Sequence, residues 1–114
     1  MQIHYLEIVT SDVDEVCETY SKLHAVTFGE SDMNLGGARV AEFSNGGKVG
    51  VRSPLRETEK PIVRHYILVN DIQATVDAAS KSGAEIAVPP MELLGYGQCA
   101  IVIHNGIETG FWQL

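Results

Sequence analysis

The sequence is poor in basic residues and has no long apolar run. Its 114 residues include 8 Lys and Arg against 15 Asp and Glu, which gives a formal net charge of -7. Nucleic acids and anionic membranes require a basic surface, so neither is expected as a partner. No apolar run approaches the roughly 20 residues of a membrane-spanning helix, and the first residues lead into a strand pattern instead of a signal peptide. We therefore expect a cytoplasmic protein.

Cysteine is also scarce, and the two cysteines do not form a site. Cys17 lies in an amphipathic helical pattern and Cys99 in an apolar strand pattern, and neither belongs to a CxxC or Cys/His spacing. Both are expected to be buried free thiols. Ser/His/Asp and Cys/His nucleophile spacings and a phosphate-binding glycine loop are missing as well. These absences exclude the common nucleophilic and nucleotide-binding classes.

The two halves of the chain repeat each other. With a shift of 59 positions residues of the first half fall on identical residues of the second, among them Ile3, Ile8, Asp12, Ser21 and Lys22, and a shift of 60 aligns Asn45-Gly46 with Asn105-Gly106. The order of patterns is also the same: an alternating strand, a polar helix cap, a helical stretch, a glycine-containing break and an Asn-Gly turn before a last strand. A unit that is present twice is expected to bury the apolar faces of its copies together.

Each half predicts the element order β-α-β-β-β. The expected strands are 3–9, 26–30, 39–43, 48–53, 62–69, 85–88, 99–104 and 108–113, with helices capped by Ser11 or Asp12 and by Asn70 or Asp71. Pro89-Pro90 are expected to end the short strand at 85–88. We predict one α+β domain over 1–114, with repeat one at 1–53, a linker at 54–61 and repeat two at 62–114. Its two units would form curved mixed sheets with the helices outside and a concave cup.

Three segments carry a resemblance to a known family. They are "EIVTSDVDEV", "ILVNDIQATVDAASKSGAEI" and "GYGQCAIVIHNGIETGFWQL". Together with the β-α-β-β-β pair they resemble the vicinal oxygen chelate superfamily, the group of glyoxalase I, bleomycin-resistance proteins and extradiol dioxygenases. The resemblance covers essentially the whole chain. Because this fold serves both catalysis and passive binding, it does not by itself decide the function.

The resemblance implies where a metal would lie. In metal-dependent members the ligands lie seven residues before the helix-starting Asp and four residues after the hairpin Gly of each half. Here those positions hold Tyr5, Gly50, Arg64 and Gly110. Glycine has no side chain, arginine stays protonated and phenol is an uncommon ligand, so we expect no metal and no cofactor at these positions.

A metal displaced from the family's register stays open as an alternative. Its donors would come from His4, Glu7, His65, His104 or Glu108. Alternation places His4 and His65 on the helix-facing side of their strands, where a histidine is usually packed and hydrogen-bonded. This placement argues against a displaced metal site but leaves it open as an alternative.

Polar and aromatic side chains gather on the predicted concave side. Alternation brings Glu7 near Arg52 or Arg64, where its carboxylate could act as a general base or orient a ligand hydroxyl or carboxylate group. The same charges could instead neutralise one another across a solvated sheet. Tyr96, between two glycines, is a candidate lid, although it and Trp112 could equally be structural. The candidate ligand-binding residues are Tyr5, Glu7, Lys48, Arg52, Arg64, Tyr66, Tyr96, Glu108 and Trp112.

Two functional classes follow from these residues. The first is a metal-free protein that binds a small organic molecule, of the drug-sequestering or carrier type. The second is an enzyme, either a metal-free isomerase or lyase with Glu7 as base or a metal-dependent member with displaced ligands. The unsuitable metal positions favour the first class. We also expect a homodimer, with the apolar end at Phe111, Trp112 and Leu114 as the pairing surface.

Overall fold

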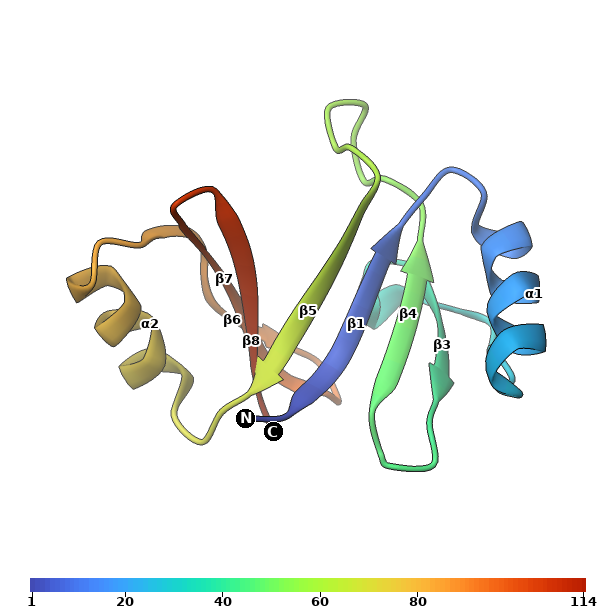
Figure 1. Cartoon of the computed structure of the whole chain (residues 1–114), viewed down its shortest axis with the longest axis horizontal. Helices are drawn as coiled ribbons and strands as arrows, with labels where there is room; N and C mark the ends of the chain where they lie inside the picture. Colours follow the sequence, from blue (N-terminus) through green and yellow to red (C-terminus); the bar gives the residue numbers. More distant parts are fainter. The chain divides into compact units, whose positions relative to one another are not determined.

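The computed structural model describes all 114 residues and contains eight strands, two α-helices and one short 3-10 helix. The chain divides into two compact units. One is Tyr5–Val63, and the other combines Met1–His4 with Arg64–Leu114. The units follow the two sequence repeats, except that residues 1–4 belong to the second unit and residues 54–63 to the first. The predicted α+β class and the paired β-α-β-β-β order are confirmed (Figure 1).

The unit built on the first repeat carries a small mixed sheet and one helix. Its strands lie in the order β2-β3-β4-β1, in which β1 and β4 are parallel and the other pairs are antiparallel. Its elements are β1 (Ile3–Val9), α1 (Val13–His24), β2 (Ser31–Asp32), η1 (Met33–Leu35), β3 (Ala38–Glu42) and β4 (Lys48–Arg52).

Helix α1 covers one face of this sheet through its apolar side, which includes Cys17. Cys17 is buried in a cluster with Ile8 from β1 and with Val49 and Val51 from β4. Leu6 packs against the same cluster, so the even-numbered residues Leu6 and Ile8 of β1 face the helix, as alternation predicts. The opposite face is left for the odd-numbered residues.

One predicted strand is wrong in the first unit. Residues 26–30 are irregular, and the strand pairing begins only at β2. Helix α1 ends at Ala25 in the left-handed conformation, and the chain then runs past β3 with a hydrogen bond from Gly29 N to Val40 O at 2.9 Å. Phe28 is buried in this stretch. The apolar pattern therefore indicated the burial of Phe28, which packs into the core without being part of a regular strand.

The second unit has the same organisation. Its strand order is β5-β8-β7-β6, with β5 parallel to β8 and the other pairs antiparallel. Helix α2 packs on the sheet through Ile72 and Val76. Its N-terminus is capped by Asp71, whose carboxylate accepts from Ala74 N at 3.0 Å. The elements are β5 (Ile62–Leu68), α2 (Ile72–Lys81), β6 (Glu85–Leu93), β7 (Gly97–His104) and β8 (Ile107–Gln113).

Strand β6 is longer than predicted. It runs through Pro89 and Pro90 to Leu93 instead of stopping before the prolines. It is the outermost strand of its unit, where a missing N–H group can point away from the ladder. The pairing with β7 shifts register between Ile86 and Val88 and again between Val88 and Met91. These irregularities accommodate the two prolines.

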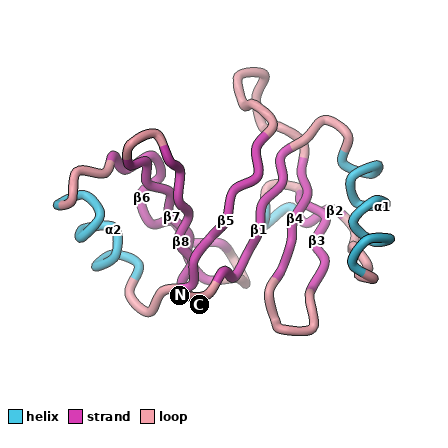
Figure 2. The backbone as a smooth tube through the Cα atoms, viewed as in Figure 1, coloured by secondary structure: helices cyan, strands magenta, loops and turns pink.

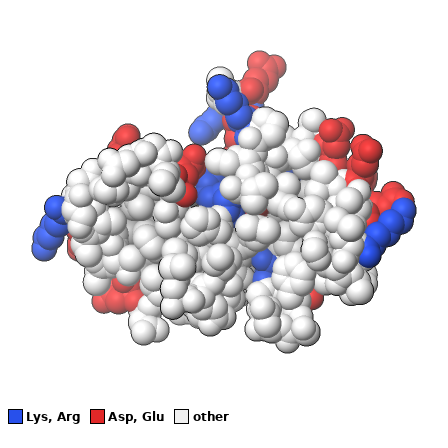
Figure 3. Space-filling model, viewed as in Figure 1, with Lys and Arg blue, Asp and Glu red and all other residues white.

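The connecting segment, residues 53–61, links β4 to β5 and contains no helix or strand (Figure 2). Its bounds lie close to the predicted linker at 54–61. Charged side chains of both signs project from this segment and from α1 on the face drawn in Figure 3. Neither α1 nor α2 combines the length and the apolar character that a bilayer-spanning helix needs.

Candidate functional site

The most strongly connected polar group of the first unit is an ion-pair network centred on Arg52. Its Nε donates to Glu7 Oε2 at 2.9 Å, and its Nη1 and Nη2 donate to the two carboxylate oxygens of Glu59 at 2.8 Å each. The three side chains are only 7%, 11% and 16% exposed for Arg52, Glu7 and Glu59. Burial makes these charge-assisted bonds stronger than surface pairs.

Strand pairing explains why Glu7 and Arg52 meet. The parallel register sets Glu7 beside Gly50 and Val9 beside Arg52, so both charged side chains lie on the sheet face opposite α1. The hydrogen bonds from Glu59 and the nearby Glu7 raise the pKa of Arg52 above its ordinary value, although burial acts in the other direction. Arg52 is therefore a fixed cation whose partners are two carboxylates.

A tyrosine ring fills the place beside Glu7 in the same unit. A Cβ atom added to Gly50 would overlap the hydroxyl group of Tyr5. Tyr5 is 3% exposed, so its ring cannot swing freely away. The glycine at the position of a family metal ligand is therefore required by the aromatic side chain that lies on it.

The second unit repeats this arrangement with a different tyrosine. Tyr66 lies opposite Gly110 in the parallel β5–β8 register, and a Cβ atom on Gly110 would come within 2.7 Å of its ring atoms Cγ and Cε2. The Tyr66 ring also makes an edge contact with Trp112, with centroids 5.7 Å apart. Both last-strand glycines thus lie beneath tyrosine rings of their own unit.

Trp112 is a core residue rather than an exposed one. It is 2% exposed, its Nε1 donates to Tyr96 O at 3.0 Å, and its ring centroid lies 5.4 Å from that of His4. Its neighbour Phe111 packs towards α2. Of the three residues predicted as a pairing surface, only Leu114 is strongly exposed, at 74%. His4 is packed, as predicted, but its contact is with Trp112.

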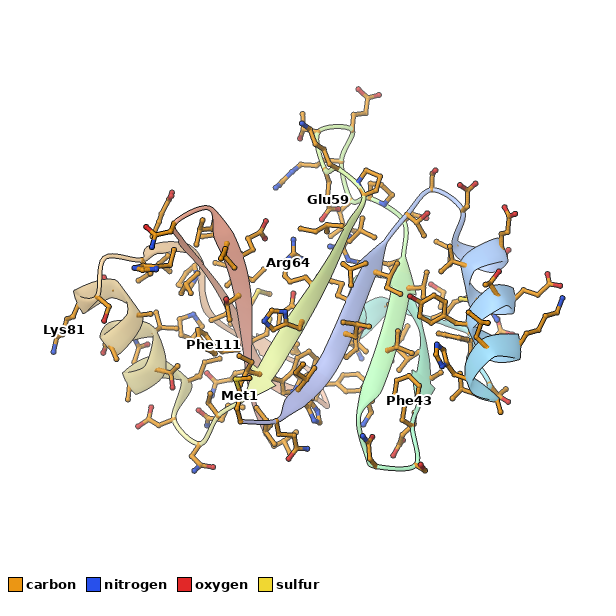
Figure 4. The ribbon with its side chains drawn as sticks, in the orientation of Figure 1. Met1, Phe43, Glu59, Arg64, Lys81 and Phe111 are labelled. Carbon is orange, nitrogen blue, oxygen red and sulfur yellow. The ribbon has the colours of Figure 1, made fainter.

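Arg64 and Glu108 form the ion pair of the second unit. Arg64 Nε donates to Glu108 Oε1 at 2.9 Å, and the side chains are 10% and 33% exposed. Figure 4 shows Arg64 on β5. Of the two arginines that alternation offered as a neighbour of Glu7, the structure of the first unit shows Arg52 in contact with it.

Two surface hollows lie away from most of the candidate residues. One, of about 530 Å³, lies in the first unit at the start of α1 and is lined by Ser11, Asp12, Val13, Asp14, Glu15, Ser31, Gly37, Arg39 and Ser53. The other, of about 300 Å³, lies in the second unit beside Tyr96. Only Tyr96 among the candidate residues lines either hollow.

Lys48, the remaining candidate residue, is half-buried at the start of β4, opposite Tyr5 in the strand register.

The donor set does not fit a metal at the family's positions. Tyr5 and Tyr66 cover the two glycines, and Arg64 is ion-paired with Glu108. No three His, Cys, Asp or Glu side chains group closely enough to hold an ion. His104 was one of the possible ligands of a displaced metal site. Its Nε2 atom lies 3.1 Å from Ser82 O.

Glu59 is the site residue that sequence reasoning missed. It lies in the linker segment two positions from Glu57, which has the same charge and is exposed. Nothing in the residue pattern distinguishes the two acids. Only the folded segment shows that Glu59 turns inward to Arg52.

Solved structures with the same fold include several epimerases. The hypothetical protein BH1468 from Bacillus halodurans C-125 matches with a TM-score of 0.76 and 17% identity over 99% of this chain and 94% of its own. Methylmalonyl-CoA epimerase from Mycobacterium tuberculosis matches with a TM-score of 0.72 and 15% identity over 97% and 86%. A Streptomyces coelicolor methylmalonyl-CoA epimerase variant, in complex with 2-nitronate-propionyl-CoA, matches with a TM-score of 0.71 and 18% identity over 99% and 94%.

These similarities identify the fold. No protein-family model and no curated protein sequence matches the chain. The structural matches nevertheless extend over nearly the whole chain, and the matched epimerases are members of the vicinal oxygen chelate superfamily. The chain therefore has the vicinal oxygen chelate fold, as the sequence resemblance indicated. At these identities the match says nothing of substrate or reaction.

Proposed function

We propose that this protein binds a small organic molecule without a metal ion at the positions that its fold family uses. The candidate surface is the side of each sheet opposite its helix. It carries the Glu7–Arg52 pair in the first unit and the Arg64–Glu108 pair in the second. Buried aromatic rings next to ordered charges suit an organic ligand with a carboxyl or hydroxyl group.

The observation that carries this proposal is the pair of covered glycines. A metal centre needs several side-chain donors that converge on one point. At Gly50 and Gly110 the space that a donor side chain would enter is filled by Tyr5 and Tyr66. Replacing either glycine by a donor residue would require a buried ring to move. The space at both donor positions is thus occupied by packed tyrosine rings.

The bonding of Glu7 also favours binding over catalysis. A general base needs a carboxylate oxygen within reach of the proton that it removes. Glu7 Oε2 accepts from Arg52, and the Glu7 side chain is 11% exposed. A carboxylate held in this way stabilises the buried arginine, which is a structural role.

The experiment combines metal analysis with a ligand screen. Protein purified without chelator should contain far less than one equivalent of zinc, nickel, iron or manganese, and added metal should leave its melting temperature unchanged. An organic ligand at about 100 times its Kd should stabilise the fold by about 2.7 kcal/mol. Stoichiometric metal that raises the melting temperature would contradict the proposal.

A matched pair of variants locates the binding surface. Arg64 belongs to the Arg64–Glu108 ion pair, whereas Arg56 is exposed on the connecting segment. Arg64→Met should abolish the thermal shift caused by an anionic ligand found in the screen, and Arg56→Met should leave it unchanged. Equal shifts in both variants would place the ligand elsewhere.

The second candidate function is an isomerase or epimerase with Glu7 as base. It is favoured by the solved structures of similar fold that are methylmalonyl-CoA epimerases. The test is to incubate the protein with methylmalonyl-CoA in heavy water, with and without divalent metal, and to follow loss of the α-proton signal by NMR. Exchange that is above background and is lost in Glu7→Gln would favour this enzyme over the binding protein.

We also propose that the chain forms a homodimer in the cytoplasm. The second unit exposes several large apolar side chains, and such surfaces are often interfaces. Leu94, Ile107 and Leu114 are 67%, 65% and 74% exposed. Sedimentation equilibrium at micromolar concentration should give twice the chain mass of 12.4 kDa. A mass of one chain across this range would refute the dimer.

A further inference from the structure

The connecting segment carries one acidic side chain that turns inward to the strands of the first unit. The side chain of Glu59 is largely buried against Arg52, while Arg56, Glu57 and Lys60 are exposed. Figure 4 shows Glu59 on this segment. A linker that only joined two strands would have no need of a buried acid in its middle.

Glu59 organises the segment and the arginine together. Its Oε1 accepts from Leu55 N at 2.7 Å as well as from Arg52 Nη1 at 2.8 Å. Its Oε2 accepts from Arg52 Nη2 at 2.8 Å. Arg52 Nη1 donates also to Ser53 O at 3.2 Å. One carboxylate thus closes a turn of the segment and holds the end of the guanidinium group.

The geometry of arginine links these contacts to Glu7. A guanidinium group is planar and rigid, so two hydrogen bonds at its Nη1/Nη2 end also fix the direction of its Nε–H. That Nε–H is the donor to Glu7 Oε2. Without the end-on pair, the arginine could rotate its end towards water at the exposed segment. The contact with Glu7 would then lose its fixed direction.

We propose that Glu59 is a positioning residue that holds Glu7 in place through Arg52, and that the connecting segment is thereby coupled to the candidate ligand-binding face. Coupling of this kind is reciprocal, so a ligand that engages Glu7 would change the exchange of the segment's amides. Only this last consequence rests on the proposed function. The Glu59–Arg52–Glu7 link itself can be tested without a ligand.

The experiment follows two protons by NMR in the full chain. The Leu55 amide reports the turn that Glu59 closes, and the Arg52 Nε–H reports the contact with Glu7. In Glu59→Ala the solvent exchange of the Leu55 amide should become about tenfold faster or more, because its acceptor is lost. The Arg52 Nε–H, whose hydrogen bond is to Glu7 Oε2, should also lose protection and shift. Glu57→Ala, in the same segment, should change neither proton.

A conservative variant separates positioning from simple loss of structure. Glu59→Gln keeps the size of the side chain and an acceptor oxygen, so it should restore part of the protection at both protons. If Glu59→Ala does not fold, Glu59→Gln carries the test, with reduced protection at the Arg52 Nε–H as the expected result. The proposal would be overturned if the protection and chemical shift of the Arg52 Nε–H were unchanged in Glu59→Ala. If only Glu59→Gln folds, an unchanged Arg52 Nε–H in that variant would overturn it. A shift of the Leu55 amide alone would also overturn it, because Glu59 would then order only its own turn.

Discussion

The covered glycine at position 50 makes a quantitative prediction. Gly50→Ala places a methyl group where the Tyr5 hydroxyl lies, and Tyr5 is buried at 3% exposure. Adding a group to a packed interior costs about 1–3 kcal/mol. Because the overlap here is with a buried ring instead of a flexible chain end, we expect about 3 kcal/mol. For a domain of this size that corresponds to a fall of about 12 °C in melting temperature.

The assay is urea denaturation with Gly29→Ala as the matched control. The nearest atom to a Cβ on Gly29 is Val40 O at 3.8 Å, which is ordinary contact. That variant should stay within about 1 kcal/mol of the wild type, since alanine also restricts the unfolded chain. The double variant Tyr5→Ala/Gly50→Ala removes the overlapping ring. It should therefore be less destabilised than the sum of its single variants.

Two outcomes would refute this reasoning. If Gly50→Ala had the same free energy of unfolding as Gly29→Ala, the Tyr5 ring would not lie on Gly50. Strict additivity in the double variant would mean that the cost of Gly50→Ala has another origin. Either result would remove the main support for a metal-free site.

Three further predictions concern capping, the buried ion pair and the thiols. Asp71→Ala should cost about 1 kcal/mol in urea denaturation because its carboxylate caps α2, whereas Asp12→Ala should cost far less because Asp12 makes no side-chain cap bond. Glu7→Gln should cost about 1–3 kcal/mol, since it removes a buried charge-assisted bond, and a stability equal to the wild type would contradict the buried pair. Burial raises the pKa of the Cys17 thiol, and Cys99 is also buried. Ellman's reagent should therefore titrate two thiols per chain in urea and react slowly with the folded protein.

Periodicity was sufficient to predict most of the elements and the faces of β1. The alternation in β1 correctly placed Glu7 on the side away from the helix. The amphipathic pattern around Cys17 likewise correctly predicted that this residue is buried. These features depend on residues close in sequence, where a period of 2 or 3.6 is enough.

The sequence pattern could not predict features that depend on the register between strands distant in the sequence. Alternation gives the face of Tyr66 but not that Gly110 lies opposite it. The role of Glu59 depends on the path of an irregular segment, and no residue pattern describes that path. The expected strand at 26–30 failed for a related reason, because an apolar segment can be buried without pairing.

The assignment of the first four residues to the second unit has a consequence for how the protein is made. Gln2 O accepts from Leu68 N at 2.8 Å, and His4 packs on Trp112, so residues from the two ends of the sequence complete one core. During synthesis the His4 strand leaves the ribosome long before Trp112. This strand must therefore stay without its native partners until β8 has been synthesised. Contacts of such long sequence separation slow folding, and we expect the second unit to form only after β8 has left the ribosome.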